Sequence, residues 1–308
     1  MESRLKGGVQ GAPHDLPAAD RFSIHPTDFH GLVPRMAVKA GAEVKAGDVL
    51  FTDKKNPDVK FVSGIAGTVQ EPVRGEKRRI LRVDVVAAGA GSVTGVTIDP
   101  TEPDGSAVRA AMLSMGFWPM LQQRPFAVMP ASDSIPRDIF VSGFDSAPLA
   151  PSAAMVLDGR MDAFRAGLAY LNALLPDGRK VQLGIAEGDT TFSGAVEADI
   201  TSFAGPHPSG NVGVQIHEVS PMNKGEVVWT VGMQDVANIG EGLMSGQYVA
   251  KRTVALTGSR SQPALLKTTV GVPLSNIIKD RVMTEGTRVN AGNVLTGTVR
   301  GDEGALGF

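Results

Sequence analysis

The spacing of apolar residues changes twice along this 308-residue chain, so one repeating architecture does not account for all of it. Before residue 100, short apolar runs such as 49–51 and 80–86 alternate with Gly, Pro, Asn and Asp, which is typical of strands joined by tight turns. From 101 to 245 strand-like runs alternate with helical periodicity, and short β runs return after that. The sequence therefore predicts a multidomain α/β plus β protein, with domains at 1–100, 101–245 and 246–308.

The central stretch carries the clearest helix signals. Apolar side chains over 108–115 recur at helical spacing, with Asp104 or Ser106 as N-cap and Gly116 as the stop. The same spacing predicts a second helix over 160–175. The other predicted elements are strands at 138–142, 180–185, 196–203 and 227–231 and a helix at 234–243. This alternation predicts a Rossmann-like α/β layer built on a mainly parallel sheet.

The two flanking domains have different local patterns. Residues 38–51 and 63–69 resemble the half-motifs of biotinyl/lipoyl domains, in which glycines turn the chain and alternating valines line a flattened barrel. Lys54 or Lys55 stands where that family carries its modified lysine, but the wider Asn-Pro-Asp loop and the usual solvation of adjacent charges favour an unmodified loop. After residue 246, one predicted helical turn at 274–278 among short strands indicates a small α+β domain.

Composition removes several classes of function. The chain has no cysteine, which excludes disulfides, thiolate nucleophiles and an iron–sulfur cluster on this chain. Its formal net charge of −2 gives no basic excess for nucleic-acid phosphates. No run approaches eighteen apolar residues and no apolar secretory segment begins the sequence. We therefore expect a soluble chain without a membrane span of its own.

Sequence motifs for nucleotide binding and hydrolysis fail on inspection. Residues 205–212 have the glycine spacing of a P-loop, but Asn211 and Val212 replace the phosphate-binding Lys and the Mg²⁺-binding Ser or Thr. The chain contains no H-E-x-x-H zinc motif and no G-x-S-x-G elbow. The sequence thus predicts neither a metal site nor catalytic residues.

Two groups of residues are candidates for binding. Ligands of open α/β sheets lie beyond the carboxyl ends of strands, where the loops carry Phe144, Asp145, Glu187 and His207. The alternative is that these are ordinary turns rich in Gly, Asp and Ser. An apolar cluster, formed by Phe117, Trp118 and Met120, is a candidate for contact with a quinone or a partner, although such residues near a helix end are usually core.

Eight segments in order along the chain closely resemble the NqrA family, which forms one component of the Na⁺-translocating NADH:quinone oxidoreductase. They are FTDKKNP (51–57), RGEKR (74–78), QRPF (123–126), FVSGFDSAPLAP (140–151), FRAGL (164–168), GPHPSGNVGVQ (205–215), VVWT (227–230) and GNVLTG (292–297). Because they cover nearly the whole sequence, chance does not explain them. The resemblance implies a lipoyl-like barrel-sandwich hybrid, a Rossmann-like layer and a small β-grasp-like domain of the SLBB type.

The resemblance also implies a place in a larger assembly. The family's chain is a cytoplasmic, peripheral component of a sodium pump in the bacterial inner membrane, docked on the other subunits, notably the membrane-embedded NqrB subunit, and associated with quinone. Flavins and the 2Fe-2S centre belong to other subunits, so the resemblance implies no cofactor on this chain and no catalysis by the isolated chain. Family members continue past Phe308, which implies a C-terminally truncated form.

An alternative comes from more distant relatives. The family is similar to the NADH- and flavin-binding subunit of respiratory complex I, which carries a glycine-rich loop after the first helix of the α/β layer. Here residues 116–124 occupy that place with large side chains such as Phe117 and Trp118, which should block the approach of a flavin phosphate to the backbone. A flavin- or NADH-binding oxidoreductase module is thus the second hypothesis.

Overall fold

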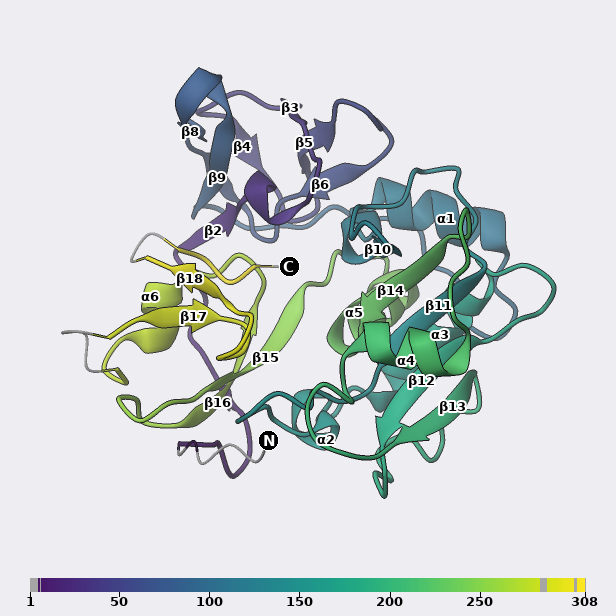
Figure 1. Ribbon diagram of the computed structural model, residues 1–308. Coiled ribbons are helices and arrows are strands. Elements are labelled where there is room, and N and C mark those ends of the chain that lie inside the picture. Colours follow the sequence, from purple (N-terminus) through teal and green to yellow (C-terminus); the bar gives the residue numbers. More distant parts are fainter. Residues whose placement is uncertain (1–4, 6, 283–286, 302–303, 308) are drawn as a thin grey trace.

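The computed structural model describes residue 5 and residues 7–282, 287–301 and 304–307. Figure 1 shows three groups of elements: an N-terminal β region (residues 21–87), an α/β region (residues 105–245) and a C-terminal region (residues 251–307). The segment 88–104 connects the first two regions, and its backbone bonds to the end of the last helix of the α/β region, Gly95 N to Gly246 O at 2.7 Å.

Short strands build the N-terminal β region. They are β2 (Arg21–Ile24), β3 (Pro34–Met36), β4 (Glu43–Val44), β5 (Val49–Asp53), β6 (Lys60–Val62), β7 (Gly67–Val69), β8 (Val73–Arg74) and β9 (Ile80–Ala87), with 3₁₀ turns η1 (Pro26–Asp28) and η2 (Glu76–Arg78). One sheet has the order β2-β9-β7-β4 with β8 on β9, and the other has the order β3-β5-β6. Phe51 and Phe61 are buried and stack with ring centroids 4.5 Å apart. Burial does not alternate strictly along these strands, because the neighbours Leu50 and Phe51 are both buried.

Strands and helices alternate in the α/β region. The elements are α1 (Gly105–Ser114), η3 (Trp118–Met120), β10 (Gln122–Arg124), β11 (Asp138–Ser142), α2 (Ala153–Val156), α3 (Met161–Asn172), β12 (Val181–Ala186), β13 (Ala198–Phe203), α4 (Val212–Val219), β14 (Val228–Gly232) and α5 (Met233–Ser245). The Asp104 side chain accepts the amide of Ala107 and caps α1, and Gly116 follows the helix at φ +81°. Both predicted boundary signals of α1 are confirmed.

The sheet order fixes where the region can bind a ligand. The order is β10-β14-β11-β12-β13; β11 runs parallel to β12 and β14, β12 runs parallel to β13, and only the edge strand β10 is antiparallel. The chain thus builds outward from β11 through β12 to β13 and then returns to the other side of β11 with β14. The mainly parallel sheet is confirmed.

Helices α3 and α5 cross at very short range. A Cβ on Gly240 would lie 1.8 Å from the carbonyl oxygen of Ala163, and a Cβ on Gly167 would lie 2.0 Å from the carbonyl oxygen of Val236. Hydrogen in place of a side chain at both positions lets the two backbones touch.

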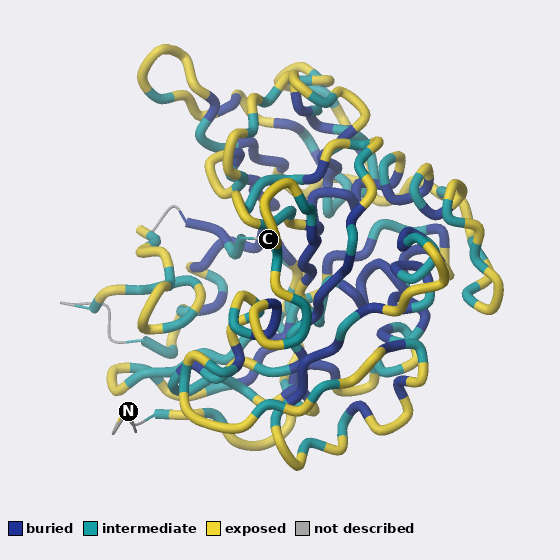
Figure 2. Tube along the Cα trace, turned by 45° about the vertical axis from the view of Figure 1, so that its right-hand side comes forward, coloured by how far each residue is buried: buried dark blue, intermediate teal, exposed yellow. Residues whose placement is uncertain are grey.

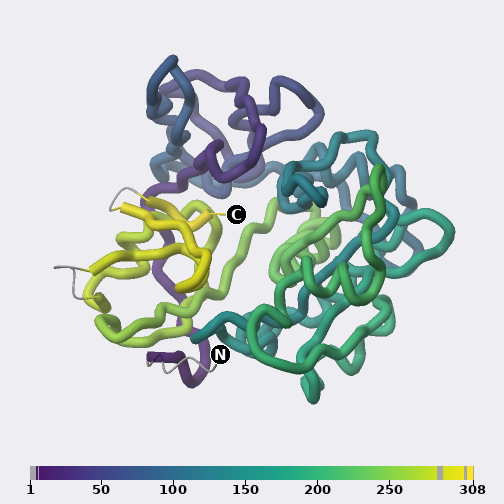
Figure 3. Tube along the Cα trace, in the orientation of Figure 1, coloured from purple at the N-terminus to yellow at the C-terminus, as the bar shows by residue number. Residues whose placement is uncertain are grey.

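The C-terminal region contains β15 (Lys251–Leu256), β16 (Ala264–Thr269), α6 (Leu274–Ile278), β17 (Val289–Ala291) and β18 (Thr298–Arg300). The predicted helical turn at 274–278 is confirmed. A short N-terminal strand, β1 (His14–Asp15), pairs in parallel with β16, and Figure 3 shows this N-terminal segment running beside the C-terminal region. Residues within 1–100 therefore take part in a sheet of the C-terminal region, while the boundaries at 100 and 245 stay predictions.

Three hydrophobic clusters form the interior, and they do not coincide with the three groups of elements. The largest runs without a break from Phe22 and Phe61 of the N-terminal β region to Trp118 and Leu243 of the α/β region. A smaller cluster around Leu266 belongs to the C-terminal region. The smallest joins Ile216 of α4 to Phe140 and Val228 of the sheet. Figure 2 shows the long buried stretches within the α/β region and the exposed loops around it. The first two regions are thus packed as one body.

Four elements of the α/β region, α2, η3, α4 and β10, were not predicted, and one predicted helix has a different end. Helix α4 was not predicted, because its first turn carries Val212, Gly213 and Val214, which are poor helix formers. Strand β10 was not predicted either, because it is short and polar and enters the sheet by pairing with the distant β14. The helix predicted over 160–175 ends earlier, at Asn172.

Candidate functional site

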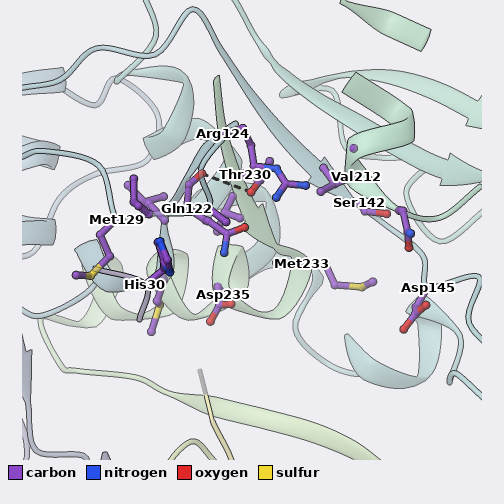
Figure 4. Close-up of a pocket in the computed structure, with 18 of the residues that line it drawn as sticks. His30, Gln122, Arg124, Met129, Ser142, Asp145, Val212, Thr230, Met233 and Asp235 are labelled. Atoms are coloured by element: carbon purple, nitrogen blue, oxygen red, sulfur yellow. Dashed lines mark hydrogen bonds between the residues drawn. The ribbon is translucent and has the colours of Figure 1, made fainter. Parts of the chain in front are cut away.

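A cavity of about 810 Å³ lies where the three regions meet. The α/β region contributes most of its lining, and Asp28, Phe29 and His30 of the N-terminal β region and Asn293 of the C-terminal region complete it. Figure 4 shows side chains around the cavity, with His30 on one side and Asp145 on the other. Its size lies within the range of about 300–1,000 Å³ that small-molecule sites occupy.

The sheet topology explains this location. The cavity is lined by Ser142 at the carboxyl end of β11 and by residues 230–232 at the carboxyl end of β14. The chain leaves β11 toward β12 on one side and reaches β14 on the other. Connections that diverge from two adjacent parallel strands leave a crevice between them, which is where open α/β sheets bind ligands.

A buried polar network fixes the floor of the cavity at the end of β11. The Gln215 amide Nε2 donates to the Ser142 hydroxyl at 2.9 Å, and that hydroxyl lies 2.9 Å from the carbonyl oxygen of Gly210 and 2.8 Å from that of Phe144. A Cβ on Gly184 would lie 2.4 Å from Gln215 Oε1. Glycine in β12 thus allows the amide to lie flat on the sheet and to hold both loops.

The loops after β11 and β13 contact each other. Ser146 Oγ lies 3.1 Å from His207 Nδ1 and accepts the amide of Gly210 at 2.8 Å. Of the four candidate cleft residues, Phe144 and Asp145 line the cavity. Glu187 and His207 are outside its lining: the amide of Glu187 donates to the carbonyl of Phe203 at 2.9 Å, and His207 supports the Ser146 loop.

The apolar candidates lie mostly in the core. Phe117 and Trp118 are both 0% exposed and are absent from the lining of the cavity. Trp118 packs edge-on against Trp229 and its Nε1 donates to the carbonyl of Pro130 at 2.9 Å. Met120 is the only one of the three that lines the cavity. Phe117 and Trp118 are therefore core residues, as Met and aromatic residues near a helix end usually are.

Much of the lining was not predicted from sequence. The missed residues come from Asp28 to His30, from the segment 121–129 around β10, from Val212 to Val214 at the start of α4, and from 230–233. Among them Arg124 belongs to the QRPF string, which was noted for its resemblance and not for its position. A prediction of β10 beside β14 would have placed this arginine at the crevice.

Both apolar and polar groups line the cavity. Three methionines, Met120, Met129 and Met233, supply adaptable apolar surface together with Phe29 and Phe144. Thr230 Oγ1 donates to the carbonyl of Gln122 at the long distance of 3.4 Å. Within the described ranges, no three His, Cys, Asp or Glu side chains gather in a way that would hold a metal ion. The arrangement suits an organic molecule of cofactor size.

The charged groups of the lining are mostly paired. Arg300 Nη2 donates to Asp28 Oδ1 at 2.7 Å, which links the C-terminal region to the N-terminal β region. Arg252 Nη2 donates to Asp235 Oδ1 at 2.6 Å, which links β15 to the first turn of α5. Asp28 and Asp235 of the lining are thus paired with arginines of the C-terminal region.

The loop with the two candidate carrier lysines is fastened to its surroundings. Lys55 Nζ donates to the carbonyl of Gly31 at 3.3 Å, and Ser132 Oγ donates to Asp58 Oδ2 at 3.1 Å. The Asn56 amide lies 3.5 Å from the carbonyl of Pro130. The loop is thus packed on the α/β region, which does not favour a freely projecting carrier arm.

Three family models match the chain in order. The model described as the NqrA N-terminal barrel-sandwich hybrid domain matches residues 1–88, the NqrA second alpha/beta domain matches residues 104–248, and the NQRA C-terminal domain matches residues 253–300. The barrel-sandwich hybrid expected for the N-terminal region is thereby confirmed.

Curated relatives are similar over nearly the whole chain. The A subunit of the Na(+)-translocating NADH-quinone reductase from Neisseria meningitidis serogroup B is 34% identical over 300 residues, covering 96% of this chain and 67% of the relative. The proteins of the same name from Shewanella frigidimarina and Serratia proteamaculans are 34% and 37% identical, and all of this chain aligns with 69% and 70% of their lengths. No helix within the described residues is both long enough and apolar enough to span a bilayer.

Proposed function

Because the chain belongs to the NqrA family, the A subunits of the Na⁺-translocating NADH-quinone reductases, we propose that it serves this complex by binding quinone and by assembling with the other subunits, notably the membrane-embedded NqrB subunit. In this proposal it is a peripheral component on the cytoplasmic side, and the isolated chain does not catalyse the reaction. Sodium transport and NADH oxidation are activities of the assembled enzyme.

The cavity at the ends of β11 and β14 is the observation that carries the quinone proposal. Its volume of about 810 Å³ accommodates a substituted ring, and Met120, Met129 and Met233 supply apolar contacts that adapt to a flat molecule. The side-chain amide of Gln122 supplies a donor for a ring carbonyl. Of the predicted candidates, Phe144, Asp145 and Met120 remain in this proposal.

The proposed domain architecture agrees with the sheet topology. The order β13-β12-β11-β14 of parallel strands, with the crevice beside β11, supports a Rossmann-like domain. A helix packed among β15 and β16 supports a β-grasp-like third domain. We keep 1–100, 101–245 and 246–308 as the proposed domain boundaries.

The proposal includes no resident flavin. Residues 117 and 118, where the flavoprotein relatives have a glycine-rich loop, are buried aromatic side chains packed against Tyr248 and Trp229. They leave no backbone surface for a phosphate there. Purified chain is expected to lack the flavin absorbance band near 450 nm, and a stoichiometric band would support the flavoprotein alternative.

Photo-crosslinking in the assembled complex tests the quinone proposal. A photoreactive quinone should label peptides that contain residues 119–129 or 230–233, and an excess of unlabelled quinone should compete. Met233→Trp fills the cavity and should strongly reduce the labelling. Met244→Trp changes an exposed methionine at the other end of the same helix, outside the lining, and should not. Labelling confined to other segments or other subunits would contradict the proposal.

A further inference from the structure

One charged side chain in the cavity lacks a partner. Asp28 is paired with Arg300 and Asp235 with Arg252, but Arg124 forms no ion pair or hydrogen bond with the side chains in the described part of the chain. It is half-buried at the end of β10 and lines the cavity. A guanidinium that is partly removed from water loses hydration, so a half-buried one normally has an acidic partner.

The surroundings keep this guanidinium free. A Cβ on Gly213 would lie 3.5 Å from Arg124 Nη2, so the arginine rests against the first turn of α4 without contacting an acidic group. Figure 4 shows Arg124 extending toward Val212 beside Thr230, and Asp145 beyond Ser142 on the right of the view. Asp145 accepts the amide of Ala147 at 2.7 Å, which holds it in its own loop.

We propose that Arg124 binds an anionic group, a phosphate or a carboxylate, of a ligand whose apolar body occupies the rest of the cavity. The planar guanidinium presents paired N–H donors that match either anion. Met120, Met129 and Met233, which line the cavity, offer adaptable apolar contacts to the remainder of such a molecule. The proposal goes beyond quinone binding, because a quinone ring is neutral and needs no fixed cation.

Three probes with one apolar body separate the possibilities. The full chain is titrated with 2-naphthyl phosphate, 2-naphthoate and 2-naphthol, and binding is followed by calorimetry. At least one anionic probe should bind about tenfold or more tightly than the neutral naphthol, since charge-assisted hydrogen bonds are the strong ones. The order of phosphate and carboxylate identifies which anion the site prefers. Equal affinity for all three probes, or no binding of any, would overturn the proposal.

Substitutions assign the preference to Arg124. Arg124→Gln should lower the affinity for the anionic probe to that of naphthol and leave naphthol unchanged. Arg35→Gln removes an exposed arginine of β3 outside the cavity and should change neither value. An anion preference that survives Arg124→Gln would refute the assignment.

A built-in anion provides a second test that keeps Arg124 in place. Gly213 lies in the first turn of α4 and has space for a side chain, so Gly213→Glu should place its carboxylate against the guanidinium. This variant should lose the anion preference and melt at a higher temperature than Gly213→Gln, which fills the same space without charge. Equal melting temperatures together with retained anion preference would show that Arg124 does not bind anions there. The quinone proposal is tested by which peptides are photolabelled, so its outcome does not depend on the outcome of these anion-binding experiments.

Discussion

At the scale of single residues, two buried tryptophans that pack against each other have opposite hydrogen-bond states. Trp118 Nε1 donates to the carbonyl of Pro130 at 2.9 Å, whereas Trp229 Nε1 has no partner among the described residues. Both side chains are 0% exposed. A buried donor without a partner costs about 1–3 kcal/mol, and a paired one contributes about 1 kcal/mol.

We therefore expect Trp118→Phe to destabilise the protein more than Trp229→Phe, by about 1–2 kcal/mol in the free energy of unfolding. Both substitutions remove a similar apolar area, so the difference isolates the hydrogen bond. Trp229→Phe also removes a buried N–H donor that has no partner among the described residues. Urea unfolding followed by circular dichroism measures both values, and a larger loss for Trp229→Phe would contradict the assignment of the bond to Pro130.

Single residues also show what sequence patterns capture. Asp104 and Gly116 marked the ends of α1 correctly because capping depends on neighbours a few positions away. Phe117 and Trp118 were ambiguous because an aromatic cluster looks the same whether it meets a ligand or a core. Their burial depends on Trp229 and Tyr248, which are distant in sequence.

At the scale of elements, the crossing of α3 and α5 depends on Gly240. A methyl group there would lie 1.8 Å from the carbonyl oxygen of Ala163, which requires the two helices to separate. Alanine is favoured over glycine within a helix by about 1 kcal/mol, but overpacking against fixed backbone costs about 3 kcal/mol.

Gly240→Ala should therefore lower the free energy of unfolding by about 2 kcal/mol or more. Gly213→Ala is the matched control, because its Cβ would meet only Arg124 Nη2 at 3.5 Å, an ordinary contact. We expect that control to leave stability unchanged or slightly higher. Chemical denaturation measures the free energy of unfolding of both variants. Equal values would show that α3 and α5 are not in backbone contact.

Elements also separate what was predictable from what was not. Strands β11, β12, β13 and β14 were predicted within two residues because buried runs of apolar residues identify them. The cavity was only half predicted. The side formed by β11 could be predicted because open α/β sheets bind ligands beyond the carboxyl ends of their strands. The other side depends on the pairing of Gln122 with Thr230, which are 108 positions apart. Local sequence patterns do not reveal such pairings.

At the scale of the whole molecule, His25 lies at the junction of the N-terminal β region and the C-terminal region. Burial is the main cause that lowers the pKa of His25 below its ordinary value of 6.5, and Arg300 and Arg82 lower it further. Asp28 and Asp84 oppose these effects. The Nε2 atom has no partner among the described residues, so no acceptor stabilises the protonated ring there.

The sign of the pH dependence follows from linkage. Above about pH 6.5 the ring is neutral in both the folded and the unfolded chain and stability is unaffected. Below that pH the unfolded chain binds the proton first, so the free energy of unfolding falls until the pH reaches the lower pKa of the folded state. The slope is at most about 1.4 kcal/mol per pH unit.

We expect wild-type protein to lose stability as the pH falls below about 6.5 and His25→Gln to lose distinctly less. Thermal melts recorded from about pH 7.5 down to about pH 5 measure the difference. The lowered pKa of Glu226, caused mainly by the amide of Asn223, acts only below its ordinary value of 4.5 and does not overlap the same interval. Parallel pH profiles for the two proteins would rule out His25 as the origin.

The pairing of β1 with β16 sets an order of events during synthesis. His14 lies opposite Leu266, so this strand emerges from the ribosome long before its partner exists. At about 5–20 residues per second, translation takes on the order of ten seconds or more to reach that partner. In that interval the N-terminal β region and the α/β region can assemble their shared interior, while the leading segment waits for the strand that will hold it.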